Sequence, residues 1–248
     1  MDLPRSFTIR EHSHRILDPF TSQQLATLGR AIRLGAGTTI LDLCCGKGEM
    51  LCTWARDHGV TGTGVDISTV FLGAARDRAA ELGVGEQVTF VHADASTYPA
   101  QEPVDVAACV GATWIGGGVA GTVELLARSV RPGGLILIGE PFWRSEPPGQ
   151  EAIEACHAMS WESFRTLPGL VGHFGELGYD LVEMVLANED SWDRYRAAQW
   201  LNIRTFLDAN PQDELAPELR AELTKAPLDY ARYGRQLLGW GVFALMRR

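Results

Sequence analysis

Apolar residues recur along this chain in two spacings, one typical of buried strands and one typical of amphipathic helices. Residues 38–45 (TTILDLCC) form a continuous apolar and β-branched run, which predicts a buried strand. Residues 20–34 carry apolar side chains at helical spacing, with Thr21 or Ser22 as the capping residue and Gly35 at the end. Further strands are expected at residues 60–67, 87–94, 104–112, 135–141, 179–187 and 239–248, and further helices at residues 48–59, 68–83, 121–134 and within 164–178.

The order of these elements predicts the fold class. Strand and helix alternate between residues 38 and 141, which is typical of βαβ units in a parallel sheet. Residues 141–150 contain three prolines and indicate a loop, and residues 191–236 are mostly helical with a break at 210–217. We therefore expect an α/β fold with a Rossmann-like, doubly wound and mostly parallel seven-stranded sheet. It forms a single domain, residues 1–248, with an N-terminal helical lid (residues 1–34) and a helical insertion (residues 191–236) before the last strand.

Composition and charge narrow the class of partner. The chain has a net charge of −9, only two lysines and no Lys/Arg run, so the electrostatic footprint of a nucleic-acid-binding protein is missing. No run approaches the ~20 apolar residues of a membrane span, and the polar N-terminal stretch leads us to expect no secretory signal. The five cysteines are odd in number, which favours a reduced protein. We expect a cytoplasmic protein that acts on a small molecule, with no nucleic acid or membrane as partner and an oligomeric state left open.

The chemistry gathers where the predicted strands end. In open parallel sheets, ligands bind beyond the carboxyl ends of the strands. Asp42, Asp66 and Asp94 lie at or near the ends of the first three strands, and the glycines of CCGKGEM follow the first of them. A carboxylate at a strand end is costly unless it is solvated or bonded. Glycines there let the backbone approach a ligand closely. The pattern therefore predicts a ligand site at this edge of the sheet.

The details of the first loop favour one ligand over others. A dinucleotide fingerprint needs a third small residue after Gly46 and Gly48, and a Walker A loop needs G-x-x-x-x-G-K-[ST]; both patterns are absent. Glu49 is a poor neighbour for a pyrophosphate. Asp42 is placed to accept from an ammonium, Asp66 from ribose hydroxyls and Asp94 from an adenine amine. These features predict S-adenosylmethionine (SAM), a nucleoside that carries an amino acid and no phosphate.

Four landmarks resemble a known family. LDLCCGKGEM resembles the first motif of class I SAM-dependent methyltransferases, usually Asp-x-Gly-x-Gly-x-Gly, and GTGVDIS, VHADA and RPGGLILIGEP resemble the next three in order, over about residues 37–187. GEMLCTWARDHG, CVGATWI and HRILDPF also resemble an uncharacterised bacterial small-molecule methyltransferase subgroup. The resemblance implies that SAM is held by Asp42, Cys44, Gly46, Gly48, Asp66, Ile67, Asp94, Ala95 and Val110.

Cys44 departs from the family pattern, because the family usually has its first glycine there. Cysteine is small, so close approach to a ligand survives where this residue has φ < 0. We expect the cysteines of the loop to be small apolar fillers. No metal site is expected, since adjacent cysteines lack the C-x₂-C spacing of zinc sites.

The reaction and its catalytic residues are less constrained. His14 is a candidate base on the lid, and the alternative is an exposed histidine without a role. Glu140 ends a strand and is a candidate to face the substrate, and the alternative is a solvated side chain at the strand end. Trp114 and Trp143 are candidate walls of a substrate pocket, with burial in the core as the alternative. The expected reaction is methyl transfer from SAM to a small molecule. A cyclopropane synthase-like enzyme and a non-catalytic SAM- or nucleotide-binding module are the alternatives.

Overall fold

A computed structural model describes residues 3–98 and 100–248. Its strands are β1 (Thr39–Leu43), β2 (Thr61–Asp66), β3 (Val88–His92), β4 (Val104–Val110), β5 (Val130–Trp143), β6 (Tyr179–Leu186) and β7 (Leu238–Arg247). They form one seven-stranded sheet in the order β3-β2-β1-β4-β5-β7-β6. Strands β1 to β5 pair in parallel, and β7 runs antiparallel between β5 and β6. The predicted fold class, a mostly parallel seven-stranded sheet, is confirmed.

The helices begin and end close to the predicted signals. They are α1 (Arg5–Arg10), α2 (Ser22–Ala31), α3 (Glu49–His58), α4 (Thr69–Glu81), α5 (Val119–Ala127), α6 (Gln150–Ala155), α7 (Leu167–Glu176), α8 (Glu189–Ala209), α9 (Ala216–Asp229) and α10 (Arg235–Leu237). Thr21 caps α2 in a capping box with Gln24, and Ser68 caps α4. The sequence pattern missed α1 and α6, which have only six residues each and little periodicity to detect.

Strand β5 is longer than the predicted 135–141. It starts at Val130, is interrupted opposite β4 by a register shift between Val104 and Val106, and continues to Trp143. The extension exists because β7 pairs with β5 from Ile136 to Trp143. Backbone pairing with a distant strand is not visible in the local pattern, so the sequence placed the strand end too early.

Each face of the sheet is covered by its own apolar core. Helices α2, α3 and α4 bury Leu28, Trp54 and Leu72 on one face. Helices α5 and α7 bury Leu126 and Phe174 on the other. The two covered faces are the arrangement of a doubly wound α/β fold.

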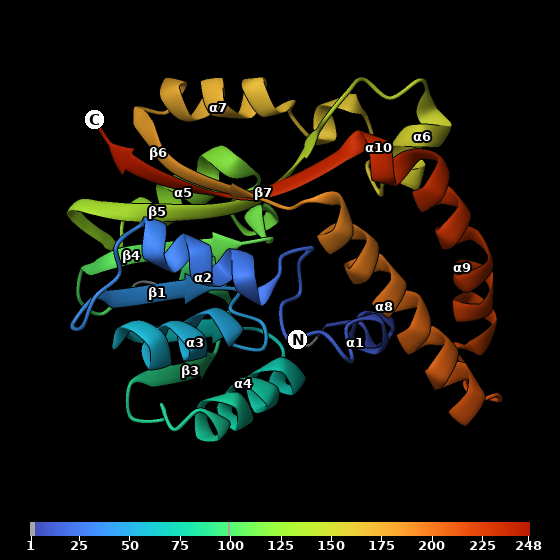
Figure 1. Ribbon diagram of the computed structural model, residues 1–248, viewed down its shortest axis with the longest axis horizontal. Helices are drawn as coiled ribbons and strands as arrows, with labels where there is room; N and C mark the ends of the chain where they lie inside the picture. Colours follow the sequence, from blue (N-terminus) through green and yellow to red (C-terminus); the bar gives the residue numbers. More distant parts are fainter. Residues whose placement is uncertain (1–2, 99) are drawn as a thin grey trace.

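A third group of helices lies beyond the sheet, on the side to which the parallel strands point (Figure 1). There α1 and α9 pack against α8, around a small apolar cluster that includes Ile9, Ile203 and Leu219. This group therefore stands next to the strand ends where the ligand site is predicted. No helix in the described residues is long and apolar enough to cross a membrane.

Candidate active site

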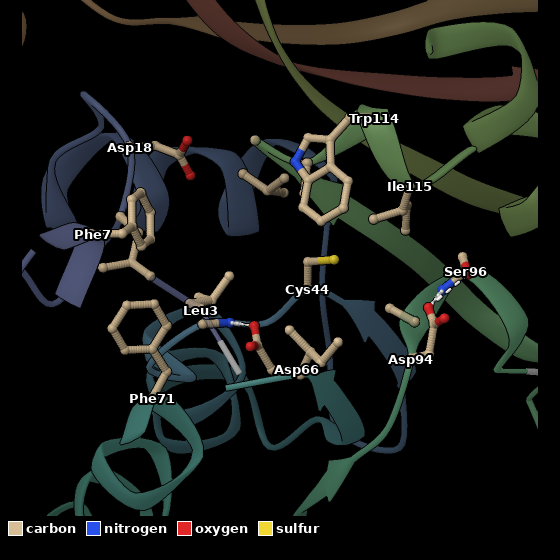
Figure 2. Close-up of a pocket in the computed structure, with 17 residues that line it drawn as sticks. Leu3, Phe7, Asp18, Cys44, Asp66, Phe71, Asp94, Ser96, Trp114 and Ile115 are labelled. Carbon is tan, nitrogen blue, oxygen red and sulfur yellow. Dashed lines mark hydrogen bonds between the residues drawn. The ribbon is translucent and has the colours of Figure 1, made fainter. Parts of the chain in front are cut away.

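A cavity of about 340 Å³ opens at the carboxyl ends of the parallel strands (Figure 2). It brings together eight of the residues predicted for the site: Cys44, Gly46, Asp66, Ile67, Asp94, Ala95, Val110 and Trp114. These residues come from four strand ends that are separated by up to 70 residues along the chain, Cys44 to Trp114. The topology of the sheet therefore assembles them as the strand-end rule predicts.

Asp66 ties the first two strand ends together. It is 6% exposed, and its two carboxylate oxygens accept from the backbone N–H of Gly46 at 2.8 Å and of Ser68 at 2.8 Å. A carboxylate oxygen has more than one lone-pair direction, so these bonds leave acceptor capacity toward the cavity. The side chain therefore holds the loop in place as well as lining the cavity.

The loop after β1 turns sharply where it meets the cavity. Cys44 has φ of 61° and Gly46 has φ of 54°, so both lie in the left-handed region. The condition of φ < 0 that was set for Cys44 from the sequence is not met, and this conformation is unfavourable for a non-glycine residue. A Cβ on Gly46 would lie 2.8 Å from Leu17. Glycine is thus required at Gly46 for two reasons, its backbone angle and the close approach of the N-terminal segment.

Gly48 and Glu49 serve packing instead of lining the cavity. Gly48 is the left-handed N-cap of α3, and a Cβ there would lie 2.6 Å from the ring of Phe90. Glu49 is buried and accepts two hydrogen bonds of 2.8 Å from Arg78, which joins α3 to α4. The prediction that Gly48 contacts the cofactor has no support in the geometry, because neighbouring helix and strand side chains surround that position.

Asp42 lies beneath the loop and does not line the main cavity. It borders a smaller adjoining cavity of about 70 Å³, and it is 3% exposed. Burial raises the pKa of its carboxyl well above the usual range, and the charges of Asp66 and Asp18 raise it further. The pKa of the nearby Cys45 thiol is also raised well above its ordinary value by burial, as expected of an unreactive filler.

Asp94 and Ala95 form the far end of the cavity. The Asp94 carboxylate accepts from the backbone N–H and the hydroxyl of Ser96 at 2.9 and 2.6 Å, and these bonds lower its pKa. Ala95 is buried beside it. Figure 2 shows Asp94 and Ser96 at one end of the cavity and Asp18 at the other. The cavity therefore presents a charged carboxylate at a position suited to the exocyclic amine of an adenine.

The N-terminal segment, residues 3–18, supplies one wall of the cavity. Within this segment, the sequence predicted only His14 as a candidate site residue. Leu3, Phe7, Leu17 and Asp18 all line the cavity. Phe7 meets Phe71 of α4 edge to face, with ring centroids 6.0 Å apart. A Cβ on Gly111, directly after β4, would clash with the carboxylate of Asp18. The motif HRILDPF contains Asp18, so a signal was present, but nothing in it showed which side chain would reach the cavity.

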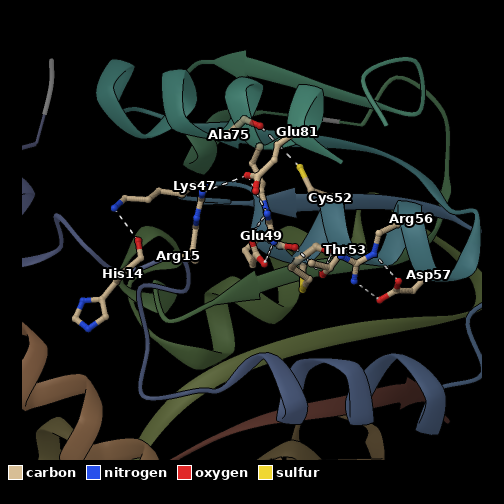
Figure 3. Close-up of polar contacts among 12 residues, drawn as sticks. His14, Arg15, Lys47, Glu49, Cys52, Thr53, Arg56, Asp57, Ala75 and Glu81 are labelled. Atoms are coloured by element: carbon tan, nitrogen blue, oxygen red, sulfur yellow. Dashed lines mark hydrogen bonds and ion pairs between the residues drawn. The ribbon is translucent and has the colours of Figure 1, made fainter. Parts of the chain in front are cut away.

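Lys47 fixes the N-terminal segment to the loop after β1. Its ammonium donates to the carbonyl oxygens of Glu11 at 2.6 Å, His12 at 3.0 Å and His14 at 2.7 Å. Figure 3 shows the side chain reaching from the loop to His14. Burial lowers the pKa of this amine. Lys47 is one of only two lysines in the chain, and that rarity was the available signal for its role.

A second set of contacts fixes the same segment to α8. The side chain of Glu11 is fully buried, and it accepts from Tyr195, Gln199 and His14 at 3.0, 2.6 and 2.8 Å. Tyr195 also donates to the carbonyl of Leu17 at 2.9 Å. The segment is therefore held on one side by the cofactor loop and on the other by α8.

The three remaining predicted residues also lie outside the main cavity. His14 stacks on Tyr195 at 4.6 Å and lines a separate cleft against α8. Glu140 accepts a 2.6 Å hydrogen bond from Thr113, and burial raises its pKa to about 7. Trp143 is 1% exposed, stacks on Trp161 and donates to its carbonyl, so it belongs to the core and is not a pocket wall. Trp114, in contrast, is 68% exposed at the cavity rim.

The residues present fit SAM. The cavity presents the carboxylate of Asp66, the carboxylate of Asp94 and apolar surface between them. Asp18 and Asp42 border the adjoining smaller cavity, and no side chain in the described residues forms a hydrogen bond or ion pair with either carboxylate. A buried carboxylate without a partner is unfavourable unless a cation or donor meets it. A ligand with an ammonium group meets that need.

Comparisons with known proteins agree with this geometry. A family model described as a methyltransferase domain matches residues 40–134. The chain is 60% identical to an uncharacterised protein, YjhP, of Escherichia coli, over 100% of both chains. It is 62% identical to a SAM-dependent methyltransferase from Geobacter sulfurreducens solved with S-adenosyl-L-homocysteine (SAH), with a TM-score of 0.98 and coverage of 100% of this chain and 99% of that one.

A more distant relative is an enzyme whose name states its methyl acceptor. The chain is 31% identical over 137 residues to 27-O-demethylrifamycin SV methyltransferase of Amycolatopsis mediterranei, which covers 55% of this chain and 50% of that one. The matching model, the full-length identity and the solved relative with SAH all point the same way. They favour a methyltransferase over both alternatives left open by the sequence, a cyclopropane synthase-like enzyme and a non-catalytic module. The chain belongs to the family of SAM-dependent methyltransferases.

Proposed function

We propose that this methyltransferase transfers its methyl group to a small molecule. The observation that carries the proposal is the covered cavity, which is closed on one side by residues 3–18 and rimmed by Phe7, Phe71 and Trp114. No Lys, Arg or His is among the described residues that line it. A nucleic-acid substrate needs a basic surface to neutralise its phosphates. An aromatic and apolar rim with few polar groups is typical of small-molecule sites.

The chain's own residues have a limited task in such a reaction. SAM supplies a methyl group already activated by its sulfonium, so orientation and exclusion of water provide much of the rate. Asp66 and Asp94 orient the nucleoside from the strand ends, and residues 3–18 cover the cavity. Trp114, on the rim, offers a flat apolar surface to the acceptor. The relative from Amycolatopsis mediterranei, whose name gives a rifamycin as its substrate, supports an acceptor of this size class.

Glu140 does not line the cavity, so for an acceptor molecule that must lose a proton we propose that it acts only through Thr113, from whose hydroxyl it accepts a hydrogen bond. Its pKa of about 7 lets the carboxyl hold or release a proton near neutral pH. Thr113, which donates to it, directly precedes Trp114 on the rim. His14 is not proposed for this role, because it faces the cleft against α8 and not the cavity.

The test is an incubation of the enzyme and methyl-labelled SAM with a whole bacterial extract. Fractions below and above about 1 kDa are then counted and analysed by mass spectrometry. We expect the label in a discrete small molecule, and we expect the variant Asp66→Ala to lose it. Label that appears only in protein or nucleic acid would refute the small-molecule acceptor while leaving the methyltransferase assignment intact.

A further inference from the structure

The buried carboxylate of Asp42 and the half-buried carboxylate of Asp18 border the smaller cavity under the loop after β1 and lack a counter-charge. Asp42 comes from the end of β1, and Asp18 comes from the N-terminal segment. Asp42 is 3% exposed, and no described residue donates to its carboxylate or to that of Asp18. Asp18 also lines the main cavity, so it stands where the two cavities meet.

The basic residues around the smaller cavity are occupied elsewhere. The ammonium of Lys47 donates hydrogen bonds to three backbone carbonyls of residues 11–14. Arg15 pairs with Glu81 at 3.2 Å. Burial is the main reason that the pKa of both Asp18 and Asp42 lies well above the usual range, with Glu11 adding to the shift at Asp18. No described side chain supplies a counter-charge to these carboxylates, and a cationic group of a ligand in the smaller cavity would supply one.

We propose that Asp18 of the N-terminal segment, together with Asp42, binds the ammonium of the amino-acid part of SAM. Figure 2 shows Asp18 and Asp94 on opposite sides of the cavity, so one bound molecule could place its amino-acid end toward Asp18 and its adenine toward Asp94. Cys44 and Gly46 lie between the two carboxylates and border both cavities. The main cavity thus continues directly into the space that the carboxylates enclose.

This assignment gives the N-terminal segment a role in cofactor binding. Asp18 belongs to the same segment that Lys47 and Tyr195 hold in place. A bound ammonium adds a contact between the cofactor and that segment, so the cofactor itself helps to hold the cover over the cavity. The inference concerns the cofactor and does not depend on the nature of the methyl acceptor.

The experiment compares two ligands that differ only at the amino-acid end. SAH carries the ammonium, and 5′-methylthioadenosine keeps the nucleoside without it. Calorimetry should show that Asp18→Asn weakens SAH binding by roughly tenfold to a hundredfold, because a charge-assisted hydrogen bond is lost. Binding of 5′-methylthioadenosine should change by less than about threefold, since it makes no such bond.

A control variant and a stability measurement separate this role from a structural one. Asp94→Asn, at the adenine end, should weaken both ligands by the same factor. Without ligand, Asp18→Asn should melt at the wild-type temperature or above it, because the change removes a half-buried carboxylate that has no counter-charge. The proposal is overturned if Asp18→Asn weakens both ligands equally, if it weakens neither, or if its only effect is a lower melting temperature.

Discussion

The cavity has two walls that are held in different ways. The strand-end wall, from the ends of β1 to β4, is fixed by backbone geometry and by the bonds of Asp66 to two backbone N–H groups. The N-terminal wall, residues 3–18, is fixed by side chains, chiefly Lys47 and Tyr195. We therefore expect loss of the Asp66 carboxylate in the strand-end wall to cost both fold stability and cofactor binding. Changes in the N-terminal wall should cost binding or local order and leave most of the fold stability intact.

The largest effect is expected at Asp66 in the strand-end wall. Asp66→Ala leaves the N–H groups of Gly46 and Ser68 without acceptors, which should lower the free energy of unfolding by about 2–5 kcal/mol. It also removes the proposed ribose contact, so SAH should bind roughly a hundredfold more weakly. Urea unfolding and calorimetry measure the two effects. Asp94→Ala is the control, because its exposed carboxylate bonds only locally, to Ser96, and its loss should lower stability less than the loss of Asp66; equal stability of both variants would contradict the structural role of Asp66.

The next effect is a pH dependence of fold stability, caused by Glu140 near the end of β5. Its pKa is raised to about 7 from an ordinary value of 4.5, so the folded state keeps a proton that the unfolded state has released. The stability that this proton provides is complete below pH 4.5 and is lost as the pH rises to about 7. The loss is on the order of 3 kcal/mol. Wild type should therefore lose stability relative to Glu140→Gln between these pH values. A constant difference across that range would show that Glu140 titrates normally.

A smaller effect is expected at the connection between the two walls. Lys47→Met removes the donor of three carbonyls in residues 11–14, which should cost about 2 kcal/mol. Limited proteolysis should then cleave residues 3–18 faster. The chain provides a matched control in its other lysine, Lys225, which pairs with Asp229 on the surface of α9. Lys225→Met should change the free energy of unfolding by less than about 0.5 kcal/mol. Unchanged cleavage in Lys47→Met would contradict the role of Lys47 in holding residues 3–18 to the strand-end wall.

The smallest effect is expected at Cys44. Its φ of 61° is unfavourable for any residue with a Cβ, and glycine adopts it freely. Cys44→Gly should therefore raise the free energy of unfolding by about 1 kcal/mol and keep SAH binding. Cys45→Gly, whose backbone is not in the left-handed region, should instead lower stability. A loss of stability in Cys44→Gly would mean that the thiol's packing outweighs the backbone strain.

The contrast between the strand-end wall and the N-terminal wall also explains which site residues the sequence could predict. The sheet and the positions of Cys44, Gly46, Asp66 and Asp94 followed from local patterns, since strand ends meet at one edge of a parallel sheet. Asp18 and Lys47 could not be found in this way. Their roles arise from contacts between segments far apart in the chain, and nothing local marks which side chain points inward.

Trp143 failed as a prediction for a related reason. It follows a predicted strand end, but the true strand continues through it because β7 pairs alongside. Its side chain is therefore carried into the core with Trp161. Gly48 does not line the cavity, because a glycine after a strand can serve helix packing as well as a ligand, and Phe90 and Ala75 fill the space around it.

Amide hydrogen exchange with and without SAH tests most directly whether SAM is held between the two walls. The account predicts slower exchange on SAH binding in residues 3–18 as well as in residues 44–49 and 66–68, with no change in α9. It also predicts that Asp18→Asn, at saturating SAH, keeps the protection of residues 44–49 and 66–68 and loses part of that in residues 3–18. Protection confined to the strand ends in the wild-type protein would contradict the account, because the N-terminal segment would then not close on the cofactor.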